Sequence, residues 1–207
     1  MGLNHNREDF ALIKEILQNV SEITNTNAIC AGGAPRDITM DLIIRDYDIY
    51  VTVPNTVGNT LDNFILPAIQ QKFIDMFGNE VSDPKLIGET WYEDNYIHSI
   101  YEFNILEMID IQIIFTKTEW ELETIVKDFP MSLSQAWITK NSNKVETTPM
   151  FDRSIELRTG VYSHKCKSSY LAKIIQKFRG FAIIPVNHMF CQAQFAKSIR
   201  QSMEIPY

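Results

Sequence analysis

The pattern of apolar and polar positions predicts a helix, a strand, a glycine turn and a second helix at the start of the chain. Apolar residues recur at helical spacing in the segment 8–25, which is therefore expected to form a helix. A short apolar run at 28–31 predicts a buried strand that Gly32-Gly33 ends. Because Pro35 suits the first turn of a helix, a helix is expected to follow and to run to about Ile43.

The middle of the chain predicts three more strands and two more helices. β-Branched and aromatic residues predict strands over 48–53, 96–106 and 107–116, and the last two are expected to be antiparallel because they are consecutive. Helical spacing predicts helices over 60–77 and 119–126.

The last third predicts mainly helices. A polar region at 139–149 is expected to form turns, and helices are expected over 168–181 and 186–202. We therefore expect an α/β (α+β) fold, with a small mixed β-sheet and helices packed on it over 1–150 and a short helical segment over 151–207.

Composition narrows the class of protein. No apolar run approaches the ~20 residues of a membrane helix, and the charged N-terminus does not resemble a signal peptide. The three cysteines are far apart and form no CxxC pair, so neither a disulfide framework nor a zinc site is indicated. We expect a soluble, cytoplasmic protein with no membrane contact.

Charge is divided unevenly along the chain. Residues 1–150 contain 10 basic and 23 acidic residues, whereas residues 151–207 contain 9 basic and 3 acidic ones. The excess of positive charge suggests that the C-terminal segment meets an anionic ligand. A solvated basic helix face explains the same charges equally well.

Three carboxylates form a candidate metal site. Asp46 and Asp48 are two apart at the opening of a predicted strand, so their side chains share a face, and Asp110 interrupts an apolar strand. Three such oxygen ligands suit Mg²⁺ or Mn²⁺ and in-line phosphoryl displacement. Alternatively, Asp46 caps a turn, Asp48 faces solvent and Asp110 pairs with a lysine.

The glycine turn is a candidate phosphate site. Gly32 and Gly33 lie where a strand ends and a helix begins, so their N–H groups and the helix dipole can face a phosphate. Arg36 adds a bidentate phosphate donor. The alternatives are a plain tight turn, and a salt bridge from Arg36 to Asp37 or Asp41.

These residues together resemble a known family. The run Gly32 to Asp37, with Asp46-Tyr47-Asp48-Ile49 at the family spacing, is similar to the head domain of bacterial poly(A) polymerases and CCA-adding tRNA nucleotidyltransferases, in the polymerase-β superfamily. The resemblance covers roughly 28–135. It implies a nucleotidyltransferase catalytic domain over 1–150 that binds an NTP, ATP or CTP, with Asp46 and Asp48 as catalytic metal ligands. Asp110 falls where some superfamily members place a third catalytic carboxylate, which implies that it acts as a third metal ligand or activates the acceptor hydroxyl.

The resemblance also implies further nucleotide-binding residues. Lys127-Asp128-Phe129-Pro130, followed by a small-residue helix, resembles the motif after the catalytic sheet in these enzymes, which implies that Lys127 and Asp128 contact the nucleotide. The family's nucleotide-recognising helix begins Glu-Asp-x-x-Arg, and the acidic pair is absent from the nearest candidate, 169–179. Lys173, Lys177 and Arg179 of that segment could still hold a triphosphate, or form a solvated face.

The implied reaction is transfer of NMP from an NTP to an acceptor hydroxyl, expected to be an RNA 3′ end, with tRNA as one candidate. Some toxin-like superfamily members modify a protein or a small molecule, and a nucleotide-binding module without activity is a third hypothesis. Retention of both Asp46 and Asp48 argues against the third, and the acidic first 150 residues argue against a large RNA footprint. About seventy residues after the head motifs are too few for the helical body and tail with which the family grips RNA, so the acceptor stays open.

Overall fold

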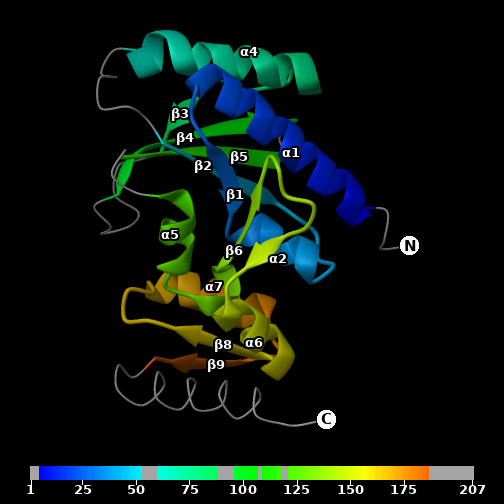
Figure 1. Ribbon diagram of the computed structural model, residues 1–207, viewed down its shortest axis with the longest axis vertical. Helices are drawn as coiled ribbons and strands as arrows, with labels where there is room; N and C mark the ends of the chain where they lie inside the picture. Colours follow the sequence, from blue (N-terminus) through cyan, green and yellow to red (C-terminus); the bar gives the residue numbers. More distant parts are fainter. Residues whose placement is uncertain (1–4, 53–59, 88–95, 107–108, 118–120, 187–207) are drawn as a thin grey trace. The chain divides into compact units, whose positions relative to one another are not determined.

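The computed structural model describes residues 5–52, 60–87, 96–106, 109–117 and 121–186 (Figure 1). The chain divides into two compact units. The first unit consists of residues 1–129 and 134–148, and the second of residues 130–133 and 149–207. Within the described residues, none of the helices combines the length and the apolar character needed to cross a membrane.

The first unit is built on a seven-stranded mixed sheet, as expected (Figure 1). Its strands stand in the order β3-β4-β5-β2-β1-β6-β7. Their bounds are β1 Ala28–Ala31, β2 Asp46–Thr52, β3 Lys85–Leu86, β4 Ile97–Ile105, β5 Ile109–Thr116, β6 Ala136–Thr139 and β7 Glu146–Thr147. Strands β2 and β5 pair in parallel, and the other described neighbours pair antiparallel, including the consecutive strands β4 and β5.

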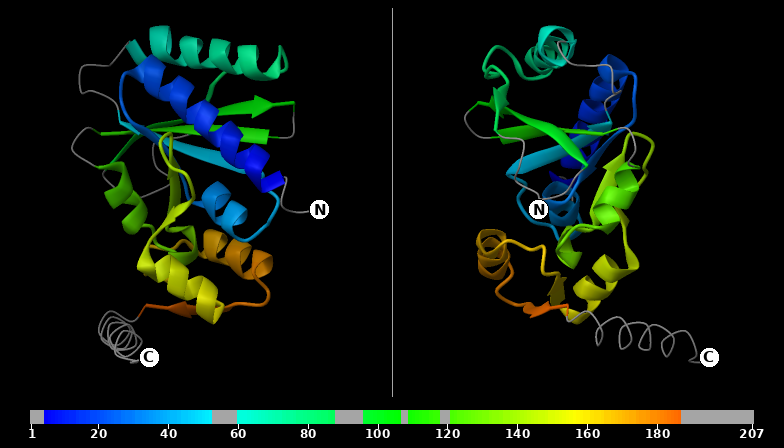
Figure 2. Two further views of the ribbon diagram at one scale, coloured as in Figure 1. Left: turned by 45° about the vertical axis from the view of Figure 1, so that its right-hand side comes forward. Right: turned by 90° about the vertical axis from the view of Figure 1, so that its left-hand side faces the viewer.

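Helices α1 (His5–Thr24) and α4 (Leu66–Phe77) pack together against one face of this sheet (Figures 1 and 2). Their apolar sides meet alternate residues of the strands, such as Ile49 and Phe103, in one core. Helix α5 (Leu122–Lys127) packs on the opposite face, in a second core that includes Tyr50. Each face of the sheet thus packs against helices in a separate hydrophobic core.

The helix after the glycine turn is shorter than expected. Helix α2 (Gly33–Thr39) ends before Ile43 because Asp41 adopts a left-handed conformation with φ of 55°. Strand β2 begins at Asp46, two residues before the expected start, because its pairing with β5 already includes this residue. The helix expected over 60–77 is confirmed, but its first turn is the π-helix η1 (Leu61–Ile65).

The segment after α5 differs from the expectation. No helix of small residues follows Pro130: the short 3₁₀ turn η2 (Ser132–Ser134) leads directly into β6, which pairs with β1. Small and apolar residues allow either structure, and the hydrogen-bonding edge of β1 favours the strand. The helix expected over 186–202 falls outside the described residues from 187 onward.

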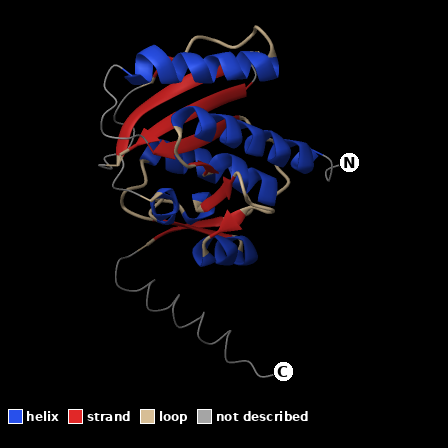
Figure 3. Cartoon of the chain, turned by 45° about the horizontal axis from the view of Figure 1, so that its top comes forward, coloured by secondary structure: helices blue, strands red, loops and turns tan. Residues whose placement is uncertain are grey.

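The second unit contains strands that the sequence did not predict. Strands β8 (Thr159–Tyr162) and β9 (Ala182–Pro185) pair in parallel, joined through α7 (Ser168–Lys177), and α6 (Pro149–Leu157) precedes them (Figure 3). The C-terminal segment is therefore not purely helical. Four-residue strands carry too little alternation to be recognised from sequence.

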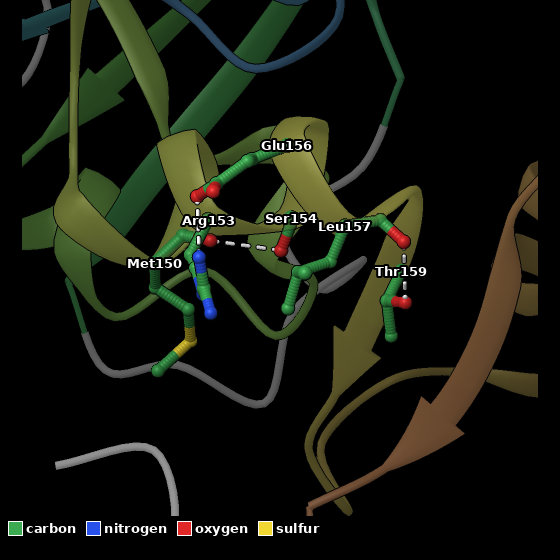
Figure 4. Close-up of polar contacts among 6 residues, drawn as sticks. All are labelled: Met150, Arg153, Ser154, Glu156, Leu157 and Thr159. Carbon is green, nitrogen blue, oxygen red and sulfur yellow. Dashed lines mark hydrogen bonds and ion pairs between the residues drawn. The ribbon is translucent and has the colours of Figure 1, made fainter. Parts of the chain in front are cut away.

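A chain of hydrogen bonds connects the elements of the second unit. The Val161 N–H donates to Ser132 Oγ at 2.9 Å, and the Ser132 and Ser154 hydroxyls are 2.8 Å apart. Ser154 Oγ donates to the Met150 carbonyl at 2.8 Å (Figure 4). The buried hydroxyls are thereby satisfied, as buried polar groups usually are.

Gly160 is expected to be indispensable for packing in the second unit. A Cβ there would lie 2.7 Å from Ile183 Cδ1 and 2.9 Å from Leu133 Cδ1, so both side chains would have to move. Gly160→Ala should lower the free energy of unfolding by about 1–2 kcal/mol, measured by urea denaturation. Gly180→Ala is the matched control, because a Cβ at Gly180 meets no atom within 4 Å. Equal stability of the two variants would contradict the packing argument.

Candidate active site

The candidate site lies on the face of the sheet that α5 covers only in part. Along β2, Tyr47 and Ile49 point into the core under α1 and α4, so Asp46 and Asp48 project from the other face, where Tyr50 joins the core under α5. Asp46 is exposed and Asp48 is half-buried. The two carboxylates therefore share a face, as predicted, and Asp48 is not the solvent-facing residue of the alternative interpretation.

Asp110 lies on the same face of the neighbouring strand. In the parallel pairing of β2 with β5, Asp46 stands opposite Asp110. No lysine of the described residues pairs with Asp110: its Oδ1 accepts a hydrogen bond of 2.8 Å from Asn104 Nδ2 of β4. The half-buried carboxylate is thus held by an amide.

Asp46 and Asp48 are the residues best placed to hold a metal ion. Among the described residues, no three His, Cys, Asp or Glu side chains come together in a metal-binding geometry. Mg²⁺ in nucleotide enzymes is typically bound by one or two carboxylates together with substrate phosphates, so a pair of carboxylates is sufficient. The role of Asp110 as a third metal ligand stays a prediction.

The electrostatics of the pair favour a bound cation. Burial, and after it the negative charge of Asp46, raise the pKa of Asp48 to about 7, although the positive charge of Arg36 acts in the opposite direction. Burial and the two carboxylates also raise the pKa of the Cys30 thiol. Negative charge in this region is therefore only partly compensated by the protein, and the carboxylate pair fits a divalent cation.

The glycine turn lies directly against both carboxylates. A Cβ on Gly32 would be 3.6 Å from Asp48 Oδ2, and one on Gly33 would be 3.5 Å from Asp46 Oδ1. Gly32 also has φ of 84°, which disfavours other residues. Its N–H donates to the Ala136 carbonyl at 3.0 Å, so it is not one of the phosphate donors that were expected. Gly33 therefore leaves open space beside Asp46 that a side chain would occupy, and phosphate binding there stays a prediction.

Arg36 makes the ion pair that was considered as its alternative role. It is buried, and its Nε donates to Asp37 Oδ1 at 2.9 Å. Its Nη2 nevertheless lies 3.7 Å from the position of a Cβ on Gly33, and its charge acts on Asp48. The salt bridge therefore fixes the guanidinium beside the turn, and a contact of Arg36 with a phosphate stays a prediction.

Lys127 and Asp128 are exposed at the end of α5 and line a surface pocket with Tyr96, Thr124 and Ile125. The next residue, Phe129, connects this segment to the site. Its ring lies 3.6 Å from the position of a Cβ on Gly32 and 5.6 Å from the Tyr50 ring centroid to centroid.

Gln135 is a residue that the sequence did not single out. Its buried Nε2 donates to the carbonyls of Lys127 and Phe129, each at 3.1 Å, and its Oε1 accepts from Thr148 Oγ1 at 2.8 Å. The amide thus fixes the segment that carries Lys127 and Asp128. No spacing rule could have found it, because the contact depends on the fold of η2 and β6.

The basic residues of α7 belong to the second unit. Lys173, Lys177 and Arg179 are exposed, and Ile174 and Phe178 form the buried side of the same segment. Their contact with a triphosphate stays a prediction.

Comparison with known proteins identifies the fold. No known protein family matches the sequence, and no curated protein matches it. Among solved structures, a CCA-adding enzyme in apo form I matches with a TM-score of 0.51 and 12% identity, over 92% of this chain and 42% of that one. The chain thus shares its α/β fold, a mixed sheet with helices packed on it, with part of that enzyme, which confirms the expected fold class.

Two further structures are similar. The Thermotoga maritima CCA-adding enzyme complexed with tRNA has a TM-score of 0.49 and 14% identity, over 83% of this chain and 38% of that one. A tRNA-processing enzyme in apo form I has a TM-score of 0.48 and 12% identity, over 95% and 48%. The chain spans less than half the length of each of these three structures.

The two glycines are expected to respond differently to alanine. Gly32→Ala forces a left-handed conformation on alanine and should lower the free energy of unfolding by about 1–2 kcal/mol. Gly33→Ala makes only ordinary contacts with Asp46 and Arg36, so stability should change by less than about 0.5 kcal/mol. Because the new methyl group covers the approach to Asp46, the affinity for Mg²⁺-ATP should fall about tenfold, measured by calorimetry. Wild-type affinity in Gly33→Ala would exclude phosphate binding at the turn.

The raised pKa of Asp48 predicts a pH-dependent loss of stability. Between pH 3.8 and about 7 the folded protein retains a proton that the unfolded chain has released, so the metal-free protein loses stability as pH rises through this range and stays less stable above it. Asp48→Asn removes this cost and should raise Tm at pH 8 by roughly 5 °C in EDTA, and by less at pH 5.

Thermal melts of both proteins at the two pH values measure the difference. Glu15→Gln, an exposed acid-to-amide change on α1, is the control and should leave Tm unchanged. A melting temperature of Asp48→Asn at or below that of the wild type at pH 8 would show that the carboxylate is not destabilising.

Proposed function

We propose that this chain transfers a nucleoside monophosphate from an NTP, ATP or CTP, to an acceptor hydroxyl, with release of pyrophosphate. The observation that carries the proposal is the contact of the Gly32-Gly33 turn with the carboxylates of Asp46 and Asp48, on a nucleotidyltransferase head fold. Because of this contact, a phosphate at the turn and a cation at the two carboxylates would lie next to each other.

Asp46 and Asp48 would hold Mg²⁺ or Mn²⁺, which would neutralise charge on the phosphates and on the entering and leaving oxygens. The residues of the chain bind and orient the nucleotide around this position. Gly33 leaves room for the phosphates, and the Arg36 guanidinium, fixed by Asp37, offers positive charge beside it. Lys127 and Asp128, held by Gln135, contact the nucleotide next to the turn.

We favour an RNA 3′ end as the acceptor, with tRNA as one candidate. Support comes from the second unit, where phosphate groups could meet basic side chains. Among its described residues, the exposed basic ones are Arg158, Lys165, Lys167, Lys173, Lys177 and Arg179.

A protein or small-molecule acceptor is the second candidate, and the acidity of the sheet face favours it. Besides Asp46 and Asp48, this face carries Asp110 and Glu102, which stand on β5 and β4. Lys85 of β3 pairs with Glu102, so its basic side chain lies on the same face of the described sheet. Such a surface attracts a cationic acceptor and repels a polyanion.

The two acceptors and the proposal itself can be tested in one experiment. The protein is incubated with Mg²⁺ and α-labelled ATP or CTP, together with either total RNA or a protein extract, and the labelled product is identified. Transfer should fall at least about 1,000-fold in the Asp46→Ala, Asp48→Ala double variant, because the cation would be lost.

Label in RNA supports the first acceptor, and label in protein or in a small molecule supports the second. Glu15→Ala, an exposed acidic position on α1, is the control and should transfer at the wild-type rate. Transfer that persists in the double variant would exclude the proposed mechanism. Nucleotide binding without any transfer would favour a binding module.

A further inference from the structure

The strand order places the glycine turn and strand β5 on opposite sides of β2. The glycine turn follows β1, which neighbours β2 on one side, and β5 followed by β4 neighbours it on the other. An in-line displacement requires the attacking oxygen to approach opposite the leaving pyrophosphate. If the phosphates lie at the glycine turn, as the proposed function requires, the acceptor hydroxyl approaches over β5 and β4.

The polar side chain of β5 nearest to Asp46 is Asp110, which accepts a hydrogen bond from a neighbouring strand. Asn104, its partner in the antiparallel pairing of β4 with β5, donates from Nδ2 to Asp110 Oδ1 at 2.8 Å. Both residues are half-buried, so the hydrogen bond is only partly exposed to competing water.

The backbone of Asn104 is fixed on its far side. Its N–H donates to Ser82 Oγ at 2.9 Å, and its carbonyl accepts from the Ser82 N–H at 2.9 Å. Asn104 is thus anchored through its backbone and directs its side-chain amide to Asp110. An anchored amide of this kind can orient the carboxylate of Asp110.

We propose that Asn104 is a positioning residue for the acceptor side of the reaction. By occupying Oδ1, its amide fixes the rotation of the Asp110 carboxylate and leaves Oδ2 to accept a hydrogen bond from the acceptor hydroxyl. The hydroxyl is thereby oriented toward the α-phosphate beside Asp46. The gain comes from orientation, because a carboxylate that rotates freely would hold the hydroxyl in the productive geometry for less of the time.

Strand β4 itself provides a matched control. The Tyr101 hydroxyl of β4 donates to Asp62 Oδ1 at 2.8 Å, and Tyr101 packs in the core on the opposite face of the sheet. Tyr101→Phe removes this hydrogen bond to a carboxylate without touching Asp110. It should leave the rate of transfer within about twofold of the wild type.

A double-mutant cycle tests the proposal, with transfer from α-labelled ATP or CTP to the acceptor that the wild type labels. Asn104→Ala should lower kcat about tenfold, the effect of one lost hydrogen bond to a charged group, and leave KM for the NTP within about twofold. In the Asp110→Ala background, Asn104→Ala should cause no further loss, because it acts through Asp110 alone. Asn104→Asp keeps the size but replaces the donor with a carboxylate, and should be at least as slow as Asn104→Ala.

Several results would overturn the proposal. A wild-type rate in Asn104→Ala or Asn104→Asp would show that the amide does not matter. An equal loss in the wild-type and Asp110→Ala backgrounds, or an equal loss in Tyr101→Phe, would show a general effect on the sheet. Circular dichroism and Tm establish that each variant is folded. A wild type that transfers no label refutes the proposed function and this inference with it, whereas an active wild type with an indifferent Asn104 refutes the inference alone.

Discussion

The parallel pairing of β2 with β5 is the constraint on which the candidate site depends. The other described strand pairs of the sheet are antiparallel. The register of this parallel pair puts Asp46 opposite Asp110. Side chains of paired residues project from the same face, so the register also aligns the buried residues Ile49 and Ile113 beneath α1 and α4. A slip of one residue would move the carboxylates into the apolar core and expose the isoleucines. The core thus enforces the geometry of the site.

The site concentrates negative charge at a cost to the fold. Asp48 is half-buried beside a second carboxylate, and the nearby guanidinium of Arg36 is already paired with Asp37. A positive charge committed to another carboxylate compensates Asp48 only in part, which explains why the pKa of Asp48 stays raised. Such uncompensated charge is expected where a ligand supplies the missing cation, because the binding of that ligand offsets the cost.

Much of the fold and part of the site followed from the sequence. Long periodic segments such as α1 and α4 were predictable because their apolar stripes are wide, and the glycine turn before a Pro-initiated helix had a local signal. Strands β6, β8 and β9 were missed because four residues show no clear period. Contacts that depend on tertiary structure could not be predicted, such as the Gly32 N–H bound by Ala136 or the carbonyls bound by Gln135. The sequence thus identified the charged residues and missed the amides that hold them.

The distribution of charge places different demands on the two candidate acceptors. Along the sheet face, a hydroxyl must approach Asp110 close to Asp46, Asp48 and Glu102, where an accompanying phosphate would be repelled. A cationic acceptor can approach these carboxylates without repulsion. An RNA avoids the repulsion only if its terminal ribose meets the carboxylates while its phosphates lie against basic groups. Basic groups are concentrated in the second unit. A bound divalent cation would reduce the repulsion for both acceptors, but the acidic residues beyond Asp46 and Asp48 would remain. If the chain transfers nucleotides as proposed, its site therefore favours an acceptor whose reactive end carries hydroxyl groups and little negative charge.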